Sequence, residues 1–208
     1  MSRPSPATAV NAAAGPRSPG PAPTPSQTVG PFYGYALPFA KGGEIAPARH
    51  PDALTVHGHV RDGAGAPVPD ALIELWQPAP DGSRRGAPGS LRRDPVTGAV
   101  IGRRDVGFTG FGRVATDADG HYELRTLPPG GVPYLSLIVF ARGLLHHLHT
   151  RAYLPELTDP DTEPLLTGLA PERRATLLLV PDGERTHRFD IRLQGDGEHE
   201  ETVFLAFE

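Results

Sequence analysis

Short runs of apolar or alternating residues, each bounded by turn residues, follow one another from Leu54 to the end of the chain. The first two, "LTVHGHVRD" and "ALIELWQP", flank the turn-like stretch "GAGAPVPD", and "FGRVATDADGHYELRT" holds two more around Asp119 and Gly120. An Asp-Gly pair between two such runs is a strong hairpin signal. Eight or nine short strands with turns between them predict an all-β protein, an antiparallel β-sandwich with long loops.

The rest of the chain adds further strands and little helix. Strand-like runs continue in "YLSLIVFARG", "LHTRAYL", "ATLLLV", "THRFDIRLQG" and "ETVFLAFE". Helix is limited to a turn or two within "TEPLLTGLAPERRATL". Residues 78–107 are rich in Gly, Pro, Arg and Asp without periodicity, which predicts a long surface excursion of the kind that is often functional.

A chain of 208 residues suits one domain with appendages. Residues 1–23 are Pro, Ala, Ser and Gly with almost nothing to bury, so we expect a disordered tail. Residues 24–53 are expected to form an extended N-terminal arm, and residues 54–208 the β-sandwich domain.

Charge and composition exclude several classes of protein. The formal net charge is −4 and the basic residues are scattered in pairs, so nucleic-acid binding is not supported. The absence of cysteine rules out disulfides and thiolate metal sites. The longest apolar run, residues 135–141, is far shorter than the roughly 20 residues that cross a bilayer, and residues 1–20 do not have the apolar stretch of a signal peptide. A soluble, cytoplasmic protein is expected.

Nine histidines without cysteine direct attention to imidazole and carboxylate metal sites. His57 and His59 lie in one predicted strand and therefore share a face, which is more often wet or interfacial than metal-binding. His147 and His149 lie between two strands and are better candidates, although polar residues at a strand start are the plainer interpretation. The glycines of "GFTGFG" precede a strand rather than a helix, so they do not predict a dinucleotide site.

Three core segments resemble a known family. "LTVHGHVRDGAGAPVPDALIELWQ", "GFGRVATDADGHYELRTLPPG" and "YLSLIVFARG…RAYL" are similar to successive core strands of the intradiol ring-cleavage dioxygenases, over about residues 24–208. "TPSQTVGPFYGYALPF", "FARGLLHHLHTRAYL" and "EETVFLAFE" are most similar to the alpha subunits of that family. The resemblance implies that this chain packs against a homologous beta subunit, partly through its arm, and that several such pairs form a larger assembly.

The family's beta subunits hold non-haem Fe(III) through two tyrosines and two histidines, and phenolates suit Fe(III) because they are hard, anionic donors. There, the second tyrosine lies in a Gly-Pro-Tyr-Pro turn, and a His-x-His pair begins the next strand. Here "RTLPPGG" runs almost directly into the strand, where Tyr134 and Ser136 stand in place of the histidines, and residues 78–120 contain no tyrosine. The resemblance therefore implies Fe(III) bound by the partner beta subunit, with no metal ligand and no catalytic residue in this chain.

What this chain supplies, by the same resemblance, is part of the partner's pocket wall. The family's Thr-x-Gly-Pro segment corresponds to Thr28, Gly30 and Pro31, and the arginine after the central strand corresponds to Arg142. Gly30 permits close backbone approach, Pro31 fixes the backbone, and Thr28 offers a hydroxyl to a carboxylate. Arg142 complements an anionic substrate. The implied reaction is O2-dependent opening of 3,4-dihydroxybenzoate between its hydroxyls, which gives 3-carboxy-cis,cis-muconate.

Two other functions stay open on the sequence. One is a stand-alone β-sandwich binding module, since many sandwiches only bind. The other is a self-sufficient dioxygenase that uses Tyr134, His147 and His149, because Tyr134 lies thirteen residues before His147, which repeats the family's spacing from tyrosine to histidine.

Overall fold

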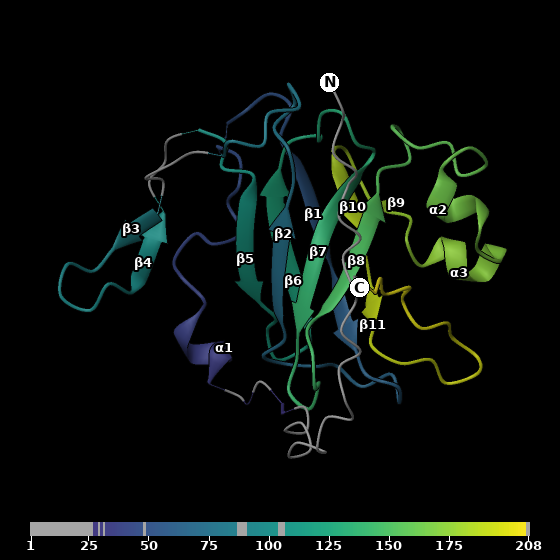
Figure 1. The fold of residues 1–208 in the computed structure, drawn as a ribbon, viewed down its shortest axis with the longest axis horizontal. Helices are drawn as coiled ribbons and strands as arrows, with labels where there is room; N and C mark the ends of the chain where they lie inside the picture. Colours follow the sequence, from purple (N-terminus) through teal and green to yellow (C-terminus); the bar gives the residue numbers. More distant parts are fainter. Residues whose placement is uncertain are drawn as a thin grey trace, which may run out of the picture.

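The computed structural model describes residues 27–28, 30, 32–47, 49–86, 91–103 and 107–206. The predicted disordered tail, residues 1–23, lies outside this part of the chain. Two β-sheets face one another (Figure 1). The short helices of residues 164–175 lie on one side, and a projecting hairpin and the short helix of residues 33–36 lie on the other. The predicted all-β sandwich is confirmed. Among the described residues, no helix has both the length and the apolar character needed to span a bilayer.

The first sheet is fully antiparallel, with strand order β5-β2-β7-β8. Its strands are β5 (Phe111–Ala115), β2 (Leu72–Trp76), β7 (Tyr134–Phe140) and β8 (Leu148–Tyr153). Along β7 the buried residues Leu135, Leu137 and Val139 alternate with half-buried ones, as expected for a strand that faces a core on one side only. Tyr134 and Ser136 therefore lie on the outer face of this sheet.

The second sheet is mixed, which differs from the antiparallel expectation. Its strands are β11 (Ile191–Arg192), β1 (Leu54–Arg61), β10 (Thr186–Arg188) and β9 (Val180–Pro181), with β6 (His121–Thr126) also paired to β1. β1 pairs antiparallel with β6 but parallel with β10 and β11. Parallel neighbours require a long crossover, and here the segment with α2 (Pro164–Thr167) and α3 (Pro171–Ala175) precedes β10.

The segment 78–107 contains regular structure that its composition did not predict. β3 (Leu91–Arg93) and β4 (Val100–Arg103) form a separate hairpin that projects from the sandwich (Figure 1). Its turn is held by Asp94, whose carboxylate accepts hydrogen bonds from the backbone N–H groups of Val96 and Thr97. The short helices α2 and α3 lie where helix was expected. The last expected strand, "ETVFLAFE", is reduced among the described residues to a single bridge between Leu205 and His149.

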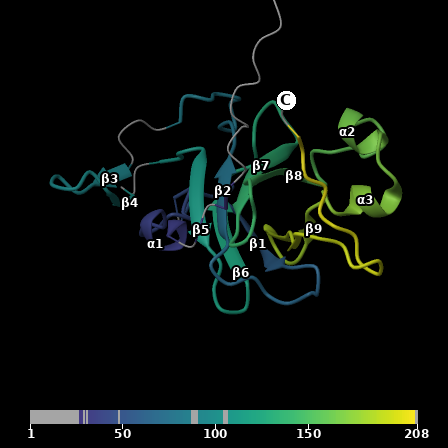
Figure 2. The same ribbon diagram turned by 60° about the horizontal axis from the view of Figure 1, so that its bottom comes forward.

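The described part of the arm packs tightly onto the sandwich. It carries the helix α1 (Tyr33–Ala36), which lies beside β5 in both views (Figures 1 and 2). Ile45 is fully buried in the core between the sheets. Gly42 accepts a hydrogen bond from Arg113 of β5, and Gly43 accepts one from Arg125 of β6. The arm therefore bridges the two sheets at one edge of the sandwich.

Candidate functional site

Arg142 lies in the turn after β7, at the end of the sandwich opposite Tyr134. Its guanidinium forms an ion pair with Asp70. The hydrogen bond that Arg142 donates to this carboxylate, followed by the carboxylate's charge, raises the pKa of Arg142. The Arg142 side chain is still 63% exposed. A cation is thus fixed at this end without being covered by the chain.

The helix α1 is docked next to Arg142. Tyr33 is buried, with its ring 6.4 Å from that of Phe140 at the end of β7. Burial, followed by the charge of Asp70, raises the pKa of the Tyr33 hydroxyl. The two other aromatic residues of this turn point outward, since Phe32 is 75% exposed and Tyr35 is 86% exposed.

The structure places Thr28 and Gly30 on the segment that leads directly into α1, and both are accessible. Gly30 has a φ of 74°, and a Cβ at this position would meet nothing within 4 Å. Pro31 lies outside the described residues. Among the described contacts none joins Thr28 or Gly30 to Arg142, so their common site stays a prediction.

At the other end of β7, Tyr134 is surrounded by residues that do not favour a metal. The Arg151 guanidinium lies 4.1 Å from the centre of the Tyr134 ring. The Arg151 side chain also donates to the Tyr153 hydroxyl at 3.3 Å, and this hydroxyl donates to Glu163 at 3.2 Å. Burial raises the pKa of Tyr153, which keeps its phenol protonated.

These residues do not fit a ferric ion. Fe(III) requires anionic donors, whereas Tyr153 is held as a neutral phenol, Ser136 offers only a hydroxyl, and Arg151 adds a fixed positive charge. The part of the chain that the structure describes contains no group of three or more His, Cys, Asp or Glu side chains arranged to hold a metal ion. No step of iron chemistry is therefore assigned to this chain.

The structure does not bring Tyr134 together with His147 and His149. In the β7–β8 ladder His149 lies opposite Ile138, four residues along the strand from Tyr134, or about 13 Å. His147 packs 4.8 Å from His149 and 5.3 Å from Phe140, at the far end of β7. The self-sufficient site built from Tyr134, His147 and His149 is therefore wrong. Burial, followed by the charge of His147, lowers the pKa of His149.

His57 and His59 share the outer face of β1, as their spacing predicts, and the structure adds His121 from β6. The ring of His121 lies 5.7 Å from that of His57 and 5.2 Å from that of His59. Carboxylates lie beside them, with Asp182 2.9 Å from His57 and Asp190 3.7 Å from His59. The cluster is a patch of imidazole and carboxylate pairs, and sequence reasoning missed its third histidine because β6 lies far along the chain.

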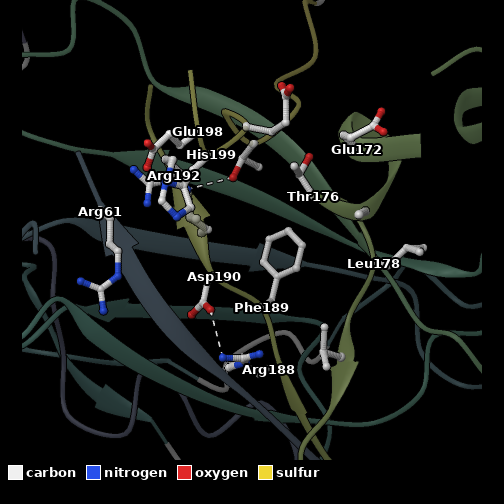
Figure 3. A pocket seen from close by; sticks show the side chains of 15 residues that line it. Arg61, Glu172, Thr176, Leu178, Arg188, Phe189, Asp190, Arg192, Glu198 and His199 are labelled. Atoms are coloured by element: carbon white, nitrogen blue, oxygen red, sulfur yellow. Dashed lines mark hydrogen bonds and ion pairs between the residues drawn. The ribbon is translucent and has the colours of Figure 1, made fainter. Parts of the chain in front are cut away.

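A large cavity, of about 490 Å³, lies between α3 and the segment 188–202 (Figure 3). Two of its arginines are paired with carboxylates: Arg188 lies 3.6 Å from Asp190 (Figure 3). Arg192 lies 3.2 Å from Asp196. Backbone N–H groups of His199 and Glu198 hold the pKa of Asp196 at about 2, so this carboxylate stays charged. None of the predicted site residues lines this cavity.

A smaller pocket of about 290 Å³ opens beside Tyr134 and Ser136. Its lining residues are Trp76, Gln77, Pro78, Arg84, Val132, Tyr134 and Ser136. Sequence reasoning did not select Trp76 or Arg84. The available signals were that Trp76 is the only tryptophan of the chain and that Arg84 lies in the long excursion after β2.

Comparison with known proteins gives one consistent result. The family described as Dioxygenase matches residues 30–156. The chain is 34% identical to the protocatechuate 3,4-dioxygenase alpha chain of Pseudomonas putida and 36% identical to that of Burkholderia cepacia, in each case over 88% of this chain and 96% of the relative. It is also 32% identical to the protocatechuate 3,4-dioxygenase beta chain of Burkholderia cepacia, over 40% of this chain and 32% of the relative.

Proposed function

Because the chain belongs to the intradiol ring-cleavage dioxygenase family, we propose that it is the alpha, non-iron-binding subunit of a protocatechuate 3,4-dioxygenase. The reaction opens the ring of 3,4-dihydroxybenzoate between its two hydroxyls and adds both atoms of O2, which gives 3-carboxy-cis,cis-muconate. The chain acts as part of a hetero-oligomeric cytoplasmic enzyme and is inactive alone.

The observation that carries this proposal is the surface formed by α1 and Arg142. It combines an exposed guanidinium with the exposed rings of Phe32 and Tyr35, next to the segment that holds Thr28 and Gly30. Exposed aromatic side chains beside a fixed charge are typical of a surface that a partner covers. In this proposal residues 24–53 contact the beta subunit, and Thr28, Gly30, Pro31 and Arg142 wall its pocket.

The cofactor is Fe(III) held by the beta subunit. The surroundings of Tyr134 support this division of roles, because the Arg151 guanidinium over the Tyr134 ring adds a positive charge that disfavours a metal cation nearby. This chain contributes by orienting the substrate: the Arg142 guanidinium attracts the carboxylate of 3,4-dihydroxybenzoate, and the Thr28 hydroxyl donates a hydrogen bond to it. The two ring hydroxyls are then left for the metal of the partner.

The proposal is tested by purifying the full chain alone and together with a homologous beta chain. We expect less than one iron atom per ten copies of this chain when it is pure, no visible absorption band, and no turnover of 3,4-dihydroxybenzoate. The co-purified pair should contain iron in proportion to the beta chain, absorb visible light and consume O2.

Stoichiometric iron in the pure chain would contradict the assignment of the metal to the partner. A beta chain that is fully active without this chain would instead favour a stand-alone binding module.

A further inference from the structure

The pocket beside Tyr134 offers a set of unused polar groups. The Arg84 guanidinium and the hydroxyls of Tyr134 and Ser136 have no hydrogen-bond or ion-pair partner among the described residues. In contrast with the large cavity near α3, where carboxylates pair with Arg188 and Arg192, the described lining of this pocket contains no acidic side chain. As far as the described residues go, the pocket therefore presents a cation without a carboxylate partner and two hydrogen-bonding hydroxyls to a ligand.

The pocket also presents a fixed aromatic surface. Trp76 is 48% exposed, yet its orientation is held from two sides. Its indole N–H donates to Glu74 at 3.2 Å, and its ring lies 4.4 Å from that of Phe111. Glu74 is itself held by Arg113, whose Nε donates to it at 2.7 Å. A half-exposed indole whose orientation is fixed before binding is suited to stacking on a flat ring.

The base of the pocket is equally rigid. Gln77 donates to the carbonyl of Leu127 at 2.8 Å and accepts a hydrogen bond from Thr126 at 2.6 Å. Gln77 thus ties the end of β2 to the end of β6, and the next residues form the pocket rim. A volume of about 290 Å³ lies at the lower end of the range for small-molecule sites, which suits a compound with a single ring.

From these features we propose that the pocket binds a small aromatic monocarboxylate, with its ring on Trp76 and its carboxylate on Arg84. The Tyr134 and Ser136 hydroxyls are placed to bond to ring substituents. The Arg151 charge next to Tyr134 also favours an anion in this region over a cation. The ligand class follows from the pocket, and only the choice of a hydroxybenzoate as the probe rests on the proposed function.

The test is equilibrium dialysis of 4-hydroxybenzoate against the full chain co-purified with its partner. This probe has a carboxylate and a phenol but not the adjacent hydroxyls that ring cleavage requires. We expect the number of bound molecules per copy of this chain to exceed the number of iron atoms by one. If the preparation contains no iron, the proposed function fails, but the pocket should still bind one molecule per chain.

Matched variants connect the extra molecule to the pocket. Arg84→Gln should weaken its binding about tenfold, since an exposed charge-assisted hydrogen bond is lost. Arg85→Gln changes the neighbouring exposed arginine, which does not line the pocket, and should leave binding unchanged. Equal numbers of bound probe and iron, or the same affinity in both variants, would overturn the proposal.

Two further ligands test the aromatic part. Cyclohexanecarboxylate and inorganic phosphate should both bind more weakly than 4-hydroxybenzoate, because neither can stack on the indole. The difference in fluorescence between the parent complex and its Trp76→Phe variant isolates the emission of Trp76, which the probe should quench. Binding of phosphate or cyclohexanecarboxylate as tight as that of the probe, or an unchanged Trp76 signal at saturation, would contradict an aromatic site.

Discussion

The positive charge of Arg142 is paired with Asp70 on one side, while most of its side chain stays exposed to solvent. Its partner Asp70 lies in the connection between β1 and β2, just before β2 begins. The backbone of Asp70 is in the left-handed region, with a φ of 65°. An ion pair that is largely open to solvent contributes little to stability, so the pair is better understood as a device that holds the guanidinium in position. A second anion can then approach the exposed side of the same group.

A substrate carboxylate is such an anion. In the complex with the beta subunit, we expect Arg142→Ala and Thr28→Ala to lower kcat/KM for 3,4-dihydroxybenzoate on the order of tenfold to a hundredfold more than for catechol, which has no carboxylate. Steady-state O2 consumption with both substrates measures this ratio.

Arg188→Ala is the matched control, because Arg188 is also exposed and paired with an aspartate but lies on β10. Its ratio should stay unchanged. Equal losses on both substrates in the Arg142 variant would show that another group recognises the carboxylate.

His149 gives the stability of the chain a dependence on pH. Because its pKa is lowered from 6.5, the folded chain binds a proton at this site less readily than the unfolded chain does. The folded state is therefore most stable, with respect to this histidine, above pH 6.5, where His149 is neutral in both states. This part of the stability is lost as the pH falls below 6.5, because the unfolded chain then binds the proton more readily. Urea unfolding at pH 7.5 and pH 5.5 should therefore show a loss of stability that is smaller in His149→Gln. The same loss in both proteins would exclude this histidine as its source.

At the level of strands and loops, the sequence predicts the features that depend on local periodicity. The alternation along β1 and β7 correctly identifies their buried faces. The segment 162–177 does contain the expected helix, as α2 and α3, but the expectation that helix is limited to this segment is wrong, because α1 forms in the arm. The parallel pairing of β10 and β11 with β1 was not predictable, since it depends on where a long connection returns. The hairpin β3–β4 was missed because its two strands are too short to show a period.

The arm shows how a glycine can set the position of a whole segment. A Cβ on Gly42 would lie 2.0 Å from the carbonyl oxygen of Arg113, which no side chain can accept. Gly42→Ala should therefore push the arm away from β5 and destabilise the fold by about 1 to 3 kcal/mol, as overpacking usually does. Thermal or urea unfolding measures the change.

Gly34→Ala is the corresponding control within α1. The new Cβ would lie 3.7 Å from the Cβ of Asp70, which is an ordinary van der Waals distance, so the stability should hardly change. An unaffected Gly42 variant would mean that the arm is not tightly docked between the sheets.

For the molecule as a whole, the exposed aromatics near α1 predict association. Without its partner the full chain should self-associate at micromolar concentration, because an interface surface is left open to water. Co-expression with the beta chain should suppress this, and Phe32→Ser with Tyr35→Ser should weaken the pair at least tenfold in analytical ultracentrifugation. Val96→Ser is the control, since Val96 is equally exposed but lies at the tip of the β3–β4 hairpin. A monomeric parent chain would contradict the expectation.

Only part of the candidate site could be predicted from the sequence, because local motifs do not show which distant segments become neighbours. Thr28, Gly30 and Arg142 are predicted from short motifs, each within a single segment, and stay a prediction. The pocket with Trp76, Arg84 and Tyr134 combines three segments that are adjacent only after β2 and β7 pair, so no local pattern indicates it. The same holds for His121 beside His57 and His59.

The strand β7 separates Tyr134, at its start, from Arg142, just beyond its finish. Because β7 is hydrogen-bonded to β2 and β8 along this length, we expect substitutions at one end to leave the geometry of the other intact. Suppose that two homologous chains descend from one duplicated ancestor, and that the end of β7 in each chain covers the beginning of β7 in the other. Mutations can then inactivate the site at the beginning of β7 in one chain without changing the site in its partner. After the gene duplication, one chain then keeps the catalytic centre and the other keeps only the residues that complete it. Natural selection preserves both chains because neither is sufficient alone.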